Sequence, residues 1–357
     1  MSVPSVRIQG SRTTQSAFAS INRRWWTALK QRRDVSLVDD EDGSIADVAV
    51  HHDLAVRFGE VAACGRRRVA VRPWDFGPYP PRWVSALRTG YDELWVYSTW
   101  SALGATAGGV EPERVRRIPL GVDPDEMRPD GPRADLGLGD RFVFAFVGAA
   151  VYRKGVDILL EALRRAFGPG DDVALVIKDH THDVFYRRQS YREQILAAAA
   201  DPGRAPIVYI DEYLPAPALA AIYRRADAFV LPYRAEGFAC PVLEAMACGT
   251  PPIIPDFGPC LDYCDATTGV LVPTRRVKLP IGRTLPINSL TFDEHIEAVH
   301  FCETPVERLA DALVATARRP PAELAALGAA AAERASAWTW AASADAVVDG
   351  IRELMRR

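Results

Sequence analysis

Segments with the apolar pattern of strands alternate with segments that have the pattern of helices along most of this 357-residue chain. Residues 142–148 are a run of Phe, Val, Ala and Gly, which predicts a buried strand. Residues 16–32 carry apolar side chains at three- and four-residue steps, which predicts a helix. Such alternation is typical of an α/β fold built on parallel sheets.

The chain is long enough for two domains of this kind. Residues 1–120 are expected to form the first domain, and residues 121–340 the second. The first domain has strands predicted at 3–9, 34–38, 47–50, 69–72 and 93–97, and helices at 16–32 and 80–89. Residues 119–140 are rich in Pro, Gly and Asp, which predicts a linker. Near the end of the chain, helices are predicted at 306–317, 321–335 and 341–357.

Residues 274–301 interrupt the alternation. They carry Pro280, Gly282 and Pro286 among side chains of mixed charge, which predicts a long loop insertion. A long loop of this kind serves either as a functional lid or as surface decoration, and the sequence leaves both readings open.

Composition narrows the class of protein. Hydrophobic residues make up 48% and charged residues 25%, as expected of a folded globular protein. A net charge of −3 gives no reason to expect a nucleic-acid binder. No apolar run is long enough to span a bilayer, and the N-terminus lacks a hydrophobic signal region. The six cysteines lack zinc-site spacing, so we expect reduced thiols, no metal and a cytoplasmic location.

Two glutamates, Glu236 and Glu244, stand in a Gly- and Ala-rich run directly after the strand-like residues 228–232. Glu236 is therefore expected on the loop that leaves a strand, and Glu244 on the helix that follows. Ligands of α/β sheets bind at this edge, where helix N-termini suit phosphate and carboxylates accept hydroxyl groups. The spacing alone also fits a plain alternative, one loop acid and one helix acid favoured by the helix dipole.

The run that contains the two glutamates is one of several stretches in a fixed order, the others being 118–123, 142–148, 152–162, 209–211, 219–231, 251–255 and 269–272. Together they resemble the retaining glycosyltransferases of family 4, with their glutamate-pair motif and GT-B fold. The resemblance covers residues 115–275 well and the N-terminal part more loosely. It implies two Rossmann-like domains facing each other across a cleft, the first binding the acceptor and the second the nucleotide-sugar donor. The final helix, about 341–357, would complete the first domain.

The resemblance implies a cationic loop for the donor diphosphate. Cations and backbone N–H groups aimed at a leaving diphosphate are the main catalytic device of such a transfer. Lys154, on a strand-to-helix loop, resembles the lysine that grips the diphosphate, with Arg153 beside it. The family commonly has an Arg after Gly148; this chain has Ala149, which leaves Arg153 as the candidate second cation. A solvated basic pair is the alternative reading.

The glutamate run supplies the other expected donor contacts. By resemblance, Glu236 contacts the hydroxyls of the donor sugar and Glu244 holds the ribose. The backbone N–H groups that would orient sugar and phosphate belong to Gly237, Phe238, Ala239 and Cys240. The nucleobase should lie near residues 210–214, although the sequence does not identify the base.

His52 is the catalytic candidate of the first domain, because it follows a predicted strand and resembles the family's active-site histidine near the acceptor. Neighbouring side chains of an extended chain point opposite ways, so only one of His51 and His52 can face the cleft, and we favour His52. A satisfied core histidine is the alternative.

Two further positions of the first domain are candidates. Gly10 resembles the loop glycine that approaches the phosphate. Trp74 and Asp75 offer a ring face and a carboxylate for an acceptor, with a buried structural Trp as the equal alternative. The absence of G-x-G-x-x-G in residues 8–16 speaks against a dinucleotide enzyme.

The resulting expectation is an enzyme that moves a sugar from a nucleotide-diphosphate sugar to a hydroxyl of a polysaccharide, glycolipid or specialised metabolite. It would need no metal or other cofactor and would bind no nucleic acid. The basic and aromatic residues 23–26 leave a weak association with membrane surfaces open. A non-catalytic nucleotide-sugar-binding homologue is the alternative, and a nucleotide-sugar epimerase is a third. Donor base, acceptor and oligomeric state stay undetermined by the sequence.

Overall fold

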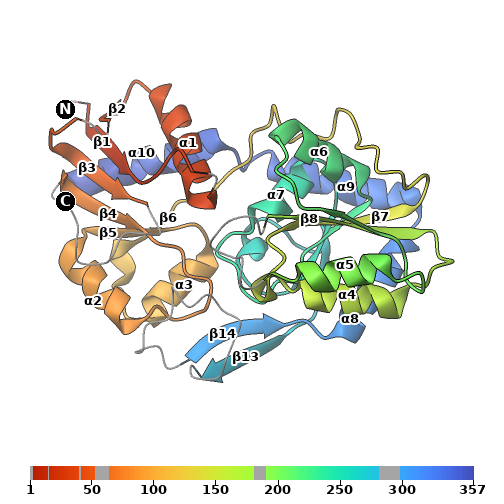
Figure 1. Ribbon diagram of the computed structural model, residues 1–357. Helices are drawn as coiled ribbons and strands as arrows, with labels where there is room; N and C mark the ends of the chain where they lie inside the picture. Colours follow the sequence, from red (N-terminus) through yellow and green to blue (C-terminus); the bar gives the residue numbers. More distant parts are fainter. Residues whose placement is uncertain (1–2, 15, 40–41, 53–63, 181–189, 281–297) are drawn as a thin grey trace. The chain divides into compact units, whose positions relative to one another are not determined.

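The computed structural model describes residues 3–14, 16–39, 42–52, 64–180, 190–280 and 298–357 (Figure 1). The chain divides into two compact units. Unit 1 comprises Met1–Gly121, Asp293–Val299 and Trp338–Arg357, and unit 2 comprises Val122–Phe292 and His300–Ala337. Each unit is built around its own parallel sheet.

Unit 1 contains a six-stranded sheet with the order β2-β1-β3-β4-β5-β6, and every pairing is parallel. Its strands are β1 Ser5–Gln9, β2 Ser36–Leu37, β3 Ala46–His51, β4 Gly65–Val71, β5 Glu93–Val96 and β6 Val115–Arg117. Its helices are α1 Ala17–Lys30, α2 Pro81–Gly90, α3 Thr99–Ala107, the 3-10 turn Pro112–Arg114 and α10 Trp340–Arg356.

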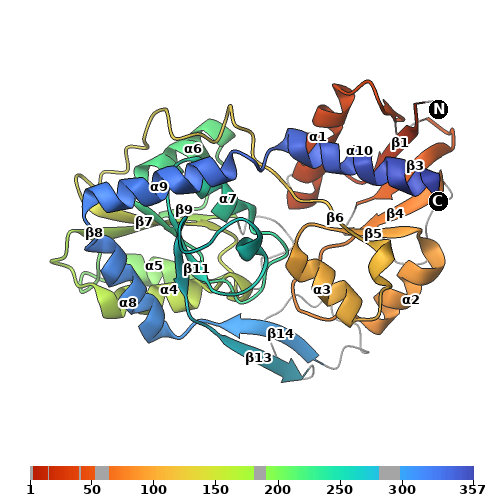
Figure 2. The ribbon, with the colours of Figure 1, turned by 180° about the vertical axis from the view of Figure 1, so that it is seen from behind.

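The last helix, α10, belongs to unit 1 although the chain passes through unit 2 before reaching it. It lies beside α1 (Figure 2). Trp25, fully buried on α1, donates its indole N–H to Ser343 Oγ on α10 at 2.8 Å. Arg32, just after α1, forms an ion pair with Asp345 of α10. A buried indole that finds a hydrogen-bond partner fixes the register between the two helices.

Unit 2 contains a second six-stranded parallel sheet with the order β12-β11-β10-β7-β8-β9. Its strands are β7 Phe142–Gly148, β8 Val173–Asp179, β9 Ile207–Ile210, β10 Ala228–Val230, β11 Pro252–Pro255 and β12 Val270–Val272. Its helices are α4 Val156–Ala166, α5 Arg192–Ala200, α6 Ala216–Arg225, α7 Cys240–Ala247, α8 Val306–Ala317 and α9 Pro321–Ala335, with 3-10 turns at Tyr152–Lys154 and Pro259–Asp262. Every residue of β8 is buried, as expected of a central parallel strand.

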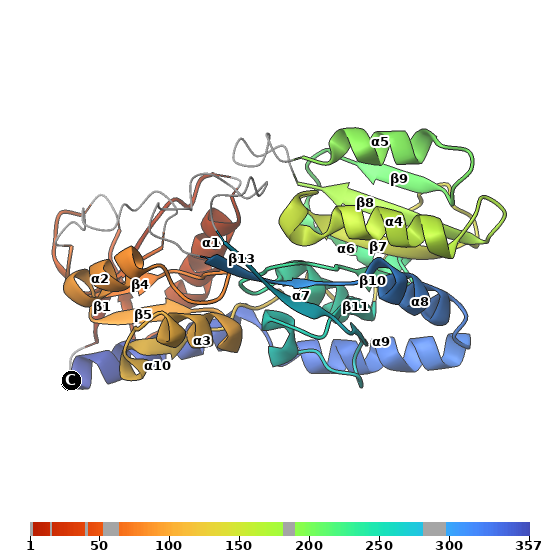
Figure 3. The same cartoon turned by 90° about the horizontal axis from the view of Figure 1, so that it is seen from below.

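Residues 274–301 are not simply a loop, and that part of the prediction was wrong. Strand β13 (Arg275–Pro280), labelled in Figure 3, pairs with strand β14 (Ala298–Glu303), labelled in Figure 1, in a separate two-stranded sheet. Arg275, Arg276 and Lys278 mask the strand pattern in the sequence, because charged side chains are depleted in strands. The segment that joins the two strands lies outside the described residues.

Helix length and hydropathy bear on membrane insertion. Within the described residues, no helix combines the length and the apolar character required to cross a bilayer. None of the six cysteines, all of which lie in the described part of the chain, is paired in a disulfide.

Candidate active site

Lys154 stands on the connection between β7 and α4, and two glycines shape this connection. The 3-10 turn Tyr152–Lys154 ends at Gly155, whose φ is +71°. A Cβ on Gly155 would lie 2.1 Å from the carbonyl oxygen of Pro232, so only glycine fits there. A Cβ on Gly148 would lie 3.0 Å from Lys154 Cδ. The backbone therefore makes room for the lysine side chain to turn inward rather than into solvent.

The inward lysine meets Glu236, on the loop between β10 and α7. Lys154 Nζ donates to Glu236 Oε1 at 2.6 Å, and Arg153 Nη1 lies 3.0 Å from the same oxygen. Arg153 Nη1 also donates to the carbonyl of Ala235 at 2.9 Å. Burial by itself raises the pKa of Glu236, but Arg153 and Lys154 outweigh burial and hold that pKa below its usual range. Glu236 is therefore ionised at neutral pH.

These three side chains form what we call the donor cluster: Arg153, Lys154 and Glu236. Its two cations share one carboxylate, which leaves one positive charge in a place where all three side chains are at most 17% exposed. Poorly hydrated cations attract anions more strongly than solvated surface cations do. The cluster is thus suited to a ligand that combines a phosphate with hydroxyl groups.

The chain after Glu236 is held in a strained conformation. Ala239, the residue before α7, has a φ of +65° and is the only non-glycine residue with positive φ in the described ranges. Tyr263 stabilises this conformation, because its hydroxyl donates to the carbonyls of Phe238 at 2.8 Å and Ala239 at 3.1 Å. Strain of this kind costs about 1–3 kcal/mol and collects at functional sites.

We expect the Ala239→Gly variant to gain stability, by up to about 1 kcal/mol, because glycine adopts positive φ without a steric penalty. Ala329→Gly, at an exposed position inside α9, is the control and should lose about 1 kcal/mol through helix propensity. Urea denaturation of both variants measures the two changes. Equal losses in both variants would show that the bend at Ala239 carries no strain.

Cys240 begins α7, and its thiol is free and only partly exposed. Burial, followed by the charges of Glu244 and Glu236, raises the pKa of Cys240 above its usual range. Because the thiolate is the nucleophilic form, the raised pKa disfavours Cys240 as a nucleophile at neutral pH. The N–H groups of residues 237–240, expected from the sequence to face the ligand, lie on the segment that runs from Glu236 into the first residue of α7.

Glu244 lies on α7, as expected, and is oriented by a tyrosine. The hydroxyl of Tyr223, a buried residue of α6, donates to Glu244 Oε2 at 2.7 Å. Burial and the Glu244 carboxylate raise the pKa of Tyr223 far above its usual value, so this hydroxyl keeps its proton. The sequence analysis did not identify Tyr223 as a residue of the candidate site, because an aromatic residue on a helix is typical of the hydrophobic core.

His52 lies inside unit 1, fully buried, with both ring nitrogens engaged. Asn22 Nδ2 donates to the carbonyls of Ser11 and His52, so Asn22 Oδ1 accepts from His52 Nδ1 at 2.5 Å. His52 Nε2 then accepts from the Tyr97 hydroxyl. Burial lowers the pKa of His52 to about 3, with Arg72 adding to the effect. The arrangement differs from the expected histidine open to substrate.

His51 is buried as well, at 4% exposure. The alternation of an extended chain predicted different surroundings for His51 and His52, with only one of them facing the cleft. The two side chains are instead both buried. Desolvation, aided by the charge of Arg68, lowers the pKa of His51 to about 4. Both histidines are thus neutral at pH 7.

The other candidates of unit 1 also take part in packing. A Cβ on Gly10, whose φ is +151°, would lie 2.1 Å from the carbonyl oxygen of His52. Trp74 is 3% exposed, donates its indole N–H to Pro78 O at 3.1 Å and contacts other aromatic rings edge-on. Asp75 is half-buried, and its carbonyl accepts from the indole of Trp100 at 3.1 Å. Of these three, Asp75 and Gly10 retain partial exposure.

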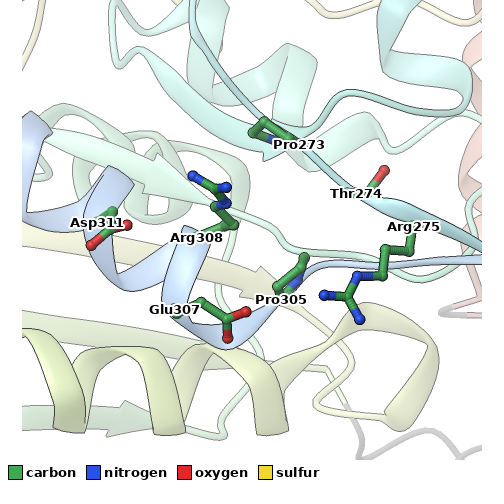
Figure 4. Close-up of a pocket in the computed structure, with 7 residues that line it drawn as sticks. All are labelled: Pro273, Thr274, Arg275, Pro305, Glu307, Arg308 and Asp311. Carbon is green, nitrogen blue, oxygen red and sulfur yellow. The ribbon is translucent and has the colours of Figure 1, made fainter.

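A separate pocket of about 300 Å³ lies where the connection from β12 to β13 meets the first turn of α8 (Figure 4). Its charged lining alternates in sign, with Arg275 and Arg308 against Glu307 and Asp311. This lining lacks the buried carboxylate and the shared cations of the donor cluster. Within the described ranges, no group of three or more His, Cys, Asp or Glu side chains could hold a metal ion.

Comparison with solved structures defines the class of fold. The Anabaena protein HepE in complex with UDP and glucose covers 98% of this chain and 99% of its own, with a TM-score of 0.68 and 14% identity. The α,α-trehalose 6-phosphate synthase of Burkholderia multivorans covers 100% of this chain and 99% of its own, with a TM-score of 0.67 and 15% identity. At these identities the likeness shows the fold alone, which is the expected α/β GT-B fold.

Comparison of sequences shows which proteins this chain is similar to. Residues 132–279 match the family model described as glycosyl transferases group 1. D-inositol 3-phosphate glycosyltransferase 1 of Catenulispora acidiphila is 33% identical over 226 residues, which are 57% of this chain and 54% of that protein. A GDP-mannose-dependent phosphatidylinositol monomannoside mannosyltransferase of Mycolicibacterium smegmatis is 32% identical over 185 residues, 48% and 45% of the two chains.

The chain spans about half the length of these curated relatives. The similarity to glycosyl transferases group 1 extends over residues 132–279. The donor cluster and Glu244 all lie within the matched range.

Proposed function

We propose that this protein is a retaining glycosyltransferase of family 4 that moves a sugar from a nucleotide-diphosphate sugar to a hydroxyl acceptor. One observation carries the proposal: the buried Glu236 carboxylate is held between Lys154 and Arg153, inside the segment that matches group 1 glycosyltransferases. The proposed enzyme is of the hexosyltransferase type and uses the nucleotide sugar as co-substrate, without a metal.

In the proposed reaction, the bond between the anomeric carbon and the diphosphate oxygen breaks, and negative charge develops on the leaving diphosphate. Lys154 and Arg153 stabilise that charge, and the N–H groups of residues 237–240 orient sugar and phosphate. The acceptor oxygen bonds to the same face of the anomeric carbon, and its proton passes to the leaving phosphate. The raised pKa of the Cys240 thiol agrees with a transfer that has no cysteine nucleophile.

The two glutamates have separate duties in this proposal. Glu236 accepts hydrogen bonds from the hydroxyls of the donor sugar, and Glu244, oriented by Tyr223, accepts those of the ribose. Unit 1 is proposed to bind the acceptor. There, His52 would act through the Gly10 loop, whose backbone closely approaches the His52 carbonyl. Asp75 is the polar candidate for acceptor contact, and Trp74 packs beside it.

A non-catalytic nucleotide-sugar-binding protein is the second candidate, favoured by Ala149 at the position where the family commonly has a cation. The distance of 3.0 Å between Arg153 and Glu236 weighs against it, because Arg153 supplies a second cation to the same place. A nucleotide-sugar epimerase of the same fold is a weaker third candidate, with no observation in its favour.

The proposal is tested first by binding and then by transfer. UDP, GDP, ADP and TDP are compared by thermal shift, where a ligand at 100 times its Kd should add about 2.7 kcal/mol. Sugars on the base that binds are then offered with a panel of hydroxyl acceptors that includes D-inositol 3-phosphate, and NMR reads the anomeric configuration of the product.

A product that keeps the donor's configuration supports the proposal, and Glu236→Gln should lower its rate of formation. Nucleotide binding without any product identifies the non-catalytic candidate. Release of an epimer without acceptor identifies the epimerase. Binding of none of the four nucleotides contradicts all three.

A further inference from the structure

We propose that Arg234 is a positioning residue for the donor cluster, which holds two carboxylates, Asp157 and Glu303, away from the cations that take the diphosphate. This inference rests on the proposed function and adds to it a residue that touches neither donor nor acceptor. It also assigns a role to strand β14, which lies beyond the segment matched by the family model.

All five N–H groups of the Arg234 guanidinium are used. Nε and Nη2 donate to the two carboxylate oxygens of Glu303, at 2.7 and 2.9 Å. Nη1 and Nη2 donate to the two oxygens of Asp157, each at 2.8 Å, and Nη1 also donates to the carbonyl of Tyr152 at 2.7 Å. The guanidinium carbon lies 3.7 Å from the centre of the Tyr152 ring, and the side chain is only 4% exposed. A fully satisfied, bidentate arginine has one geometry, so its partners are fixed as well.

The backbone of Arg234 joins the same elements. Its N–H donates to the carbonyl of Arg153 at 2.7 Å, and its carbonyl accepts from the N–H of Cys302 on β14 at 2.9 Å. Glu236 follows two residues later. Arg234 therefore ties the turn that carries Arg153 and Lys154 to the loop that carries Glu236, and ties both to β14.

The charges explain why an arginine stands here. The donor cluster has two cations and one carboxylate, whereas Arg234 is one cation between two carboxylates. Asp157 lies only three residues after Lys154, in the first turn of α4. Without Arg234, the carboxylates of Asp157 and Glu303 would lose their partner, compete with phosphate for Lys154 and Arg153, and repel an incoming diphosphate. Clamping both carboxylates keeps the donor cations available.

The test separates this electrostatic role from a purely structural one. Arg234→Met removes the cation at similar length and frees both carboxylates. The triple variant Arg234→Met/Asp157→Asn/Glu303→Gln removes the cation together with both negative charges. Affinity for UDP and GDP is measured by calorimetry at low and at high salt, alongside kcat and KM for the corresponding sugar donor.

Arg234→Met is expected to weaken diphosphate binding on the order of tenfold to a hundredfold, more strongly at low salt than at high salt. The triple variant is expected to recover most of this loss. Arg334→Met, which breaks the exposed pair with Asp265 on unit 2, is the control and should leave binding as it is. A triple variant as weak as Arg234→Met, or an Arg234→Met variant that binds like the wild type, overturns the proposal.

Glu303→Gln keeps the test decisive if Arg234→Met does not fold. It removes one negative charge while Arg234 and Asp157 remain paired, so binding should become tighter, by roughly two- to fivefold. Tenfold weaker binding contradicts the electrostatic role. A wild-type protein that binds no nucleoside diphosphate rejects the proposed function and this inference together, whereas wild-type binding with the wrong variant pattern rejects this inference alone.

Discussion

The Lys154→Met variant is expected to lose activity by a factor on the order of 10² to 10³ in kcat/KM, because it removes a buried donor aimed at the charge of the leaving group. The ammonium lies 2.6 Å from Glu236 and is part of a cluster at most 17% exposed. Methionine keeps the length of the side chain, so the loss reports on charge rather than on packing. Steady-state rates of sugar transfer, with the donor identified by the binding panel, measure the effect.

Two further variants sharpen this result. Lys278→Met, at an exposed position on β13, removes a lysine of the same chain outside the donor cluster and should stay within about twofold of wild type. Glu236→Gln should bind a nucleoside diphosphate at least as tightly as wild type, since the carboxylate that shares the two cations is gone, while its rate of transfer falls. An active Lys154→Met variant, or parallel losses of binding in Lys154→Met and Glu236→Gln, would contradict the assigned roles.

The placement of Lys154 and Glu236 on loops after strands could be predicted from the sequence because it depends on local pattern. Continuous apolar runs marked β7 and β10, and the glycines that follow, Gly155 and Gly237, marked a turn into a helix. In a parallel sheet, the carboxyl ends of neighbouring strands meet at one edge, and β7 and β10 are neighbours. Local pattern therefore placed each side chain on such a loop, and the structure adds that the two strands are neighbours and that the two side chains meet.

The partners of these residues depend on contacts distant in the sequence, and local pattern does not contain them. Strand β14 pairs with β13 and carries Glu303, which binds Arg234 although the two residues are 69 positions apart in the sequence. The contact of Asn22 with His52 likewise joins positions 30 residues apart. In the sequence, nothing distinguishes Arg234 from the many arginines that are expected to be exposed to solvent. Only tertiary structure shows that its side chain is buried and fully paired.

The same limitation applies to His52, whose position after a strand was predicted and whose surroundings were not. The sequence places it at the carboxyl end of β3, which is where ligands bind in such sheets. Asn22, Tyr97 and the rings of Phe18 and Trp25 enclose it instead. A histidine held neutral in this way makes the folded state sensitive to acid, and this consequence can be measured.

Stability is expected to fall when the pH is lowered from 7.5 to 5.5, by about 1.4 kcal/mol for each of the two buried histidines. The pKa is about 3 for His52 and about 4 for His51 in the folded protein, and the ordinary value in an unfolded chain is 6.5. Between these values the unfolded state binds more protons than the folded state. The contribution to stability is therefore complete above pH 6.5 and is lost as the pH falls toward the folded-state values.

Urea denaturation at the two pH values, followed by tryptophan fluorescence, measures the loss, and His52→Gln is the matched variant. Glutamine can still hydrogen-bond inside the pocket formed by Asn22 and Tyr97 but has no charge to gain, so His52→Gln should lose about 1.4 kcal/mol less than wild type over this interval. Carboxylates do not imitate the effect, because their ordinary pKa values lie near 4, below the interval. If wild type and His52→Gln lose equal stability, His52 is protonated in the folded protein, and the tautomer fixed by Asn22 and Tyr97 does not hold in solution.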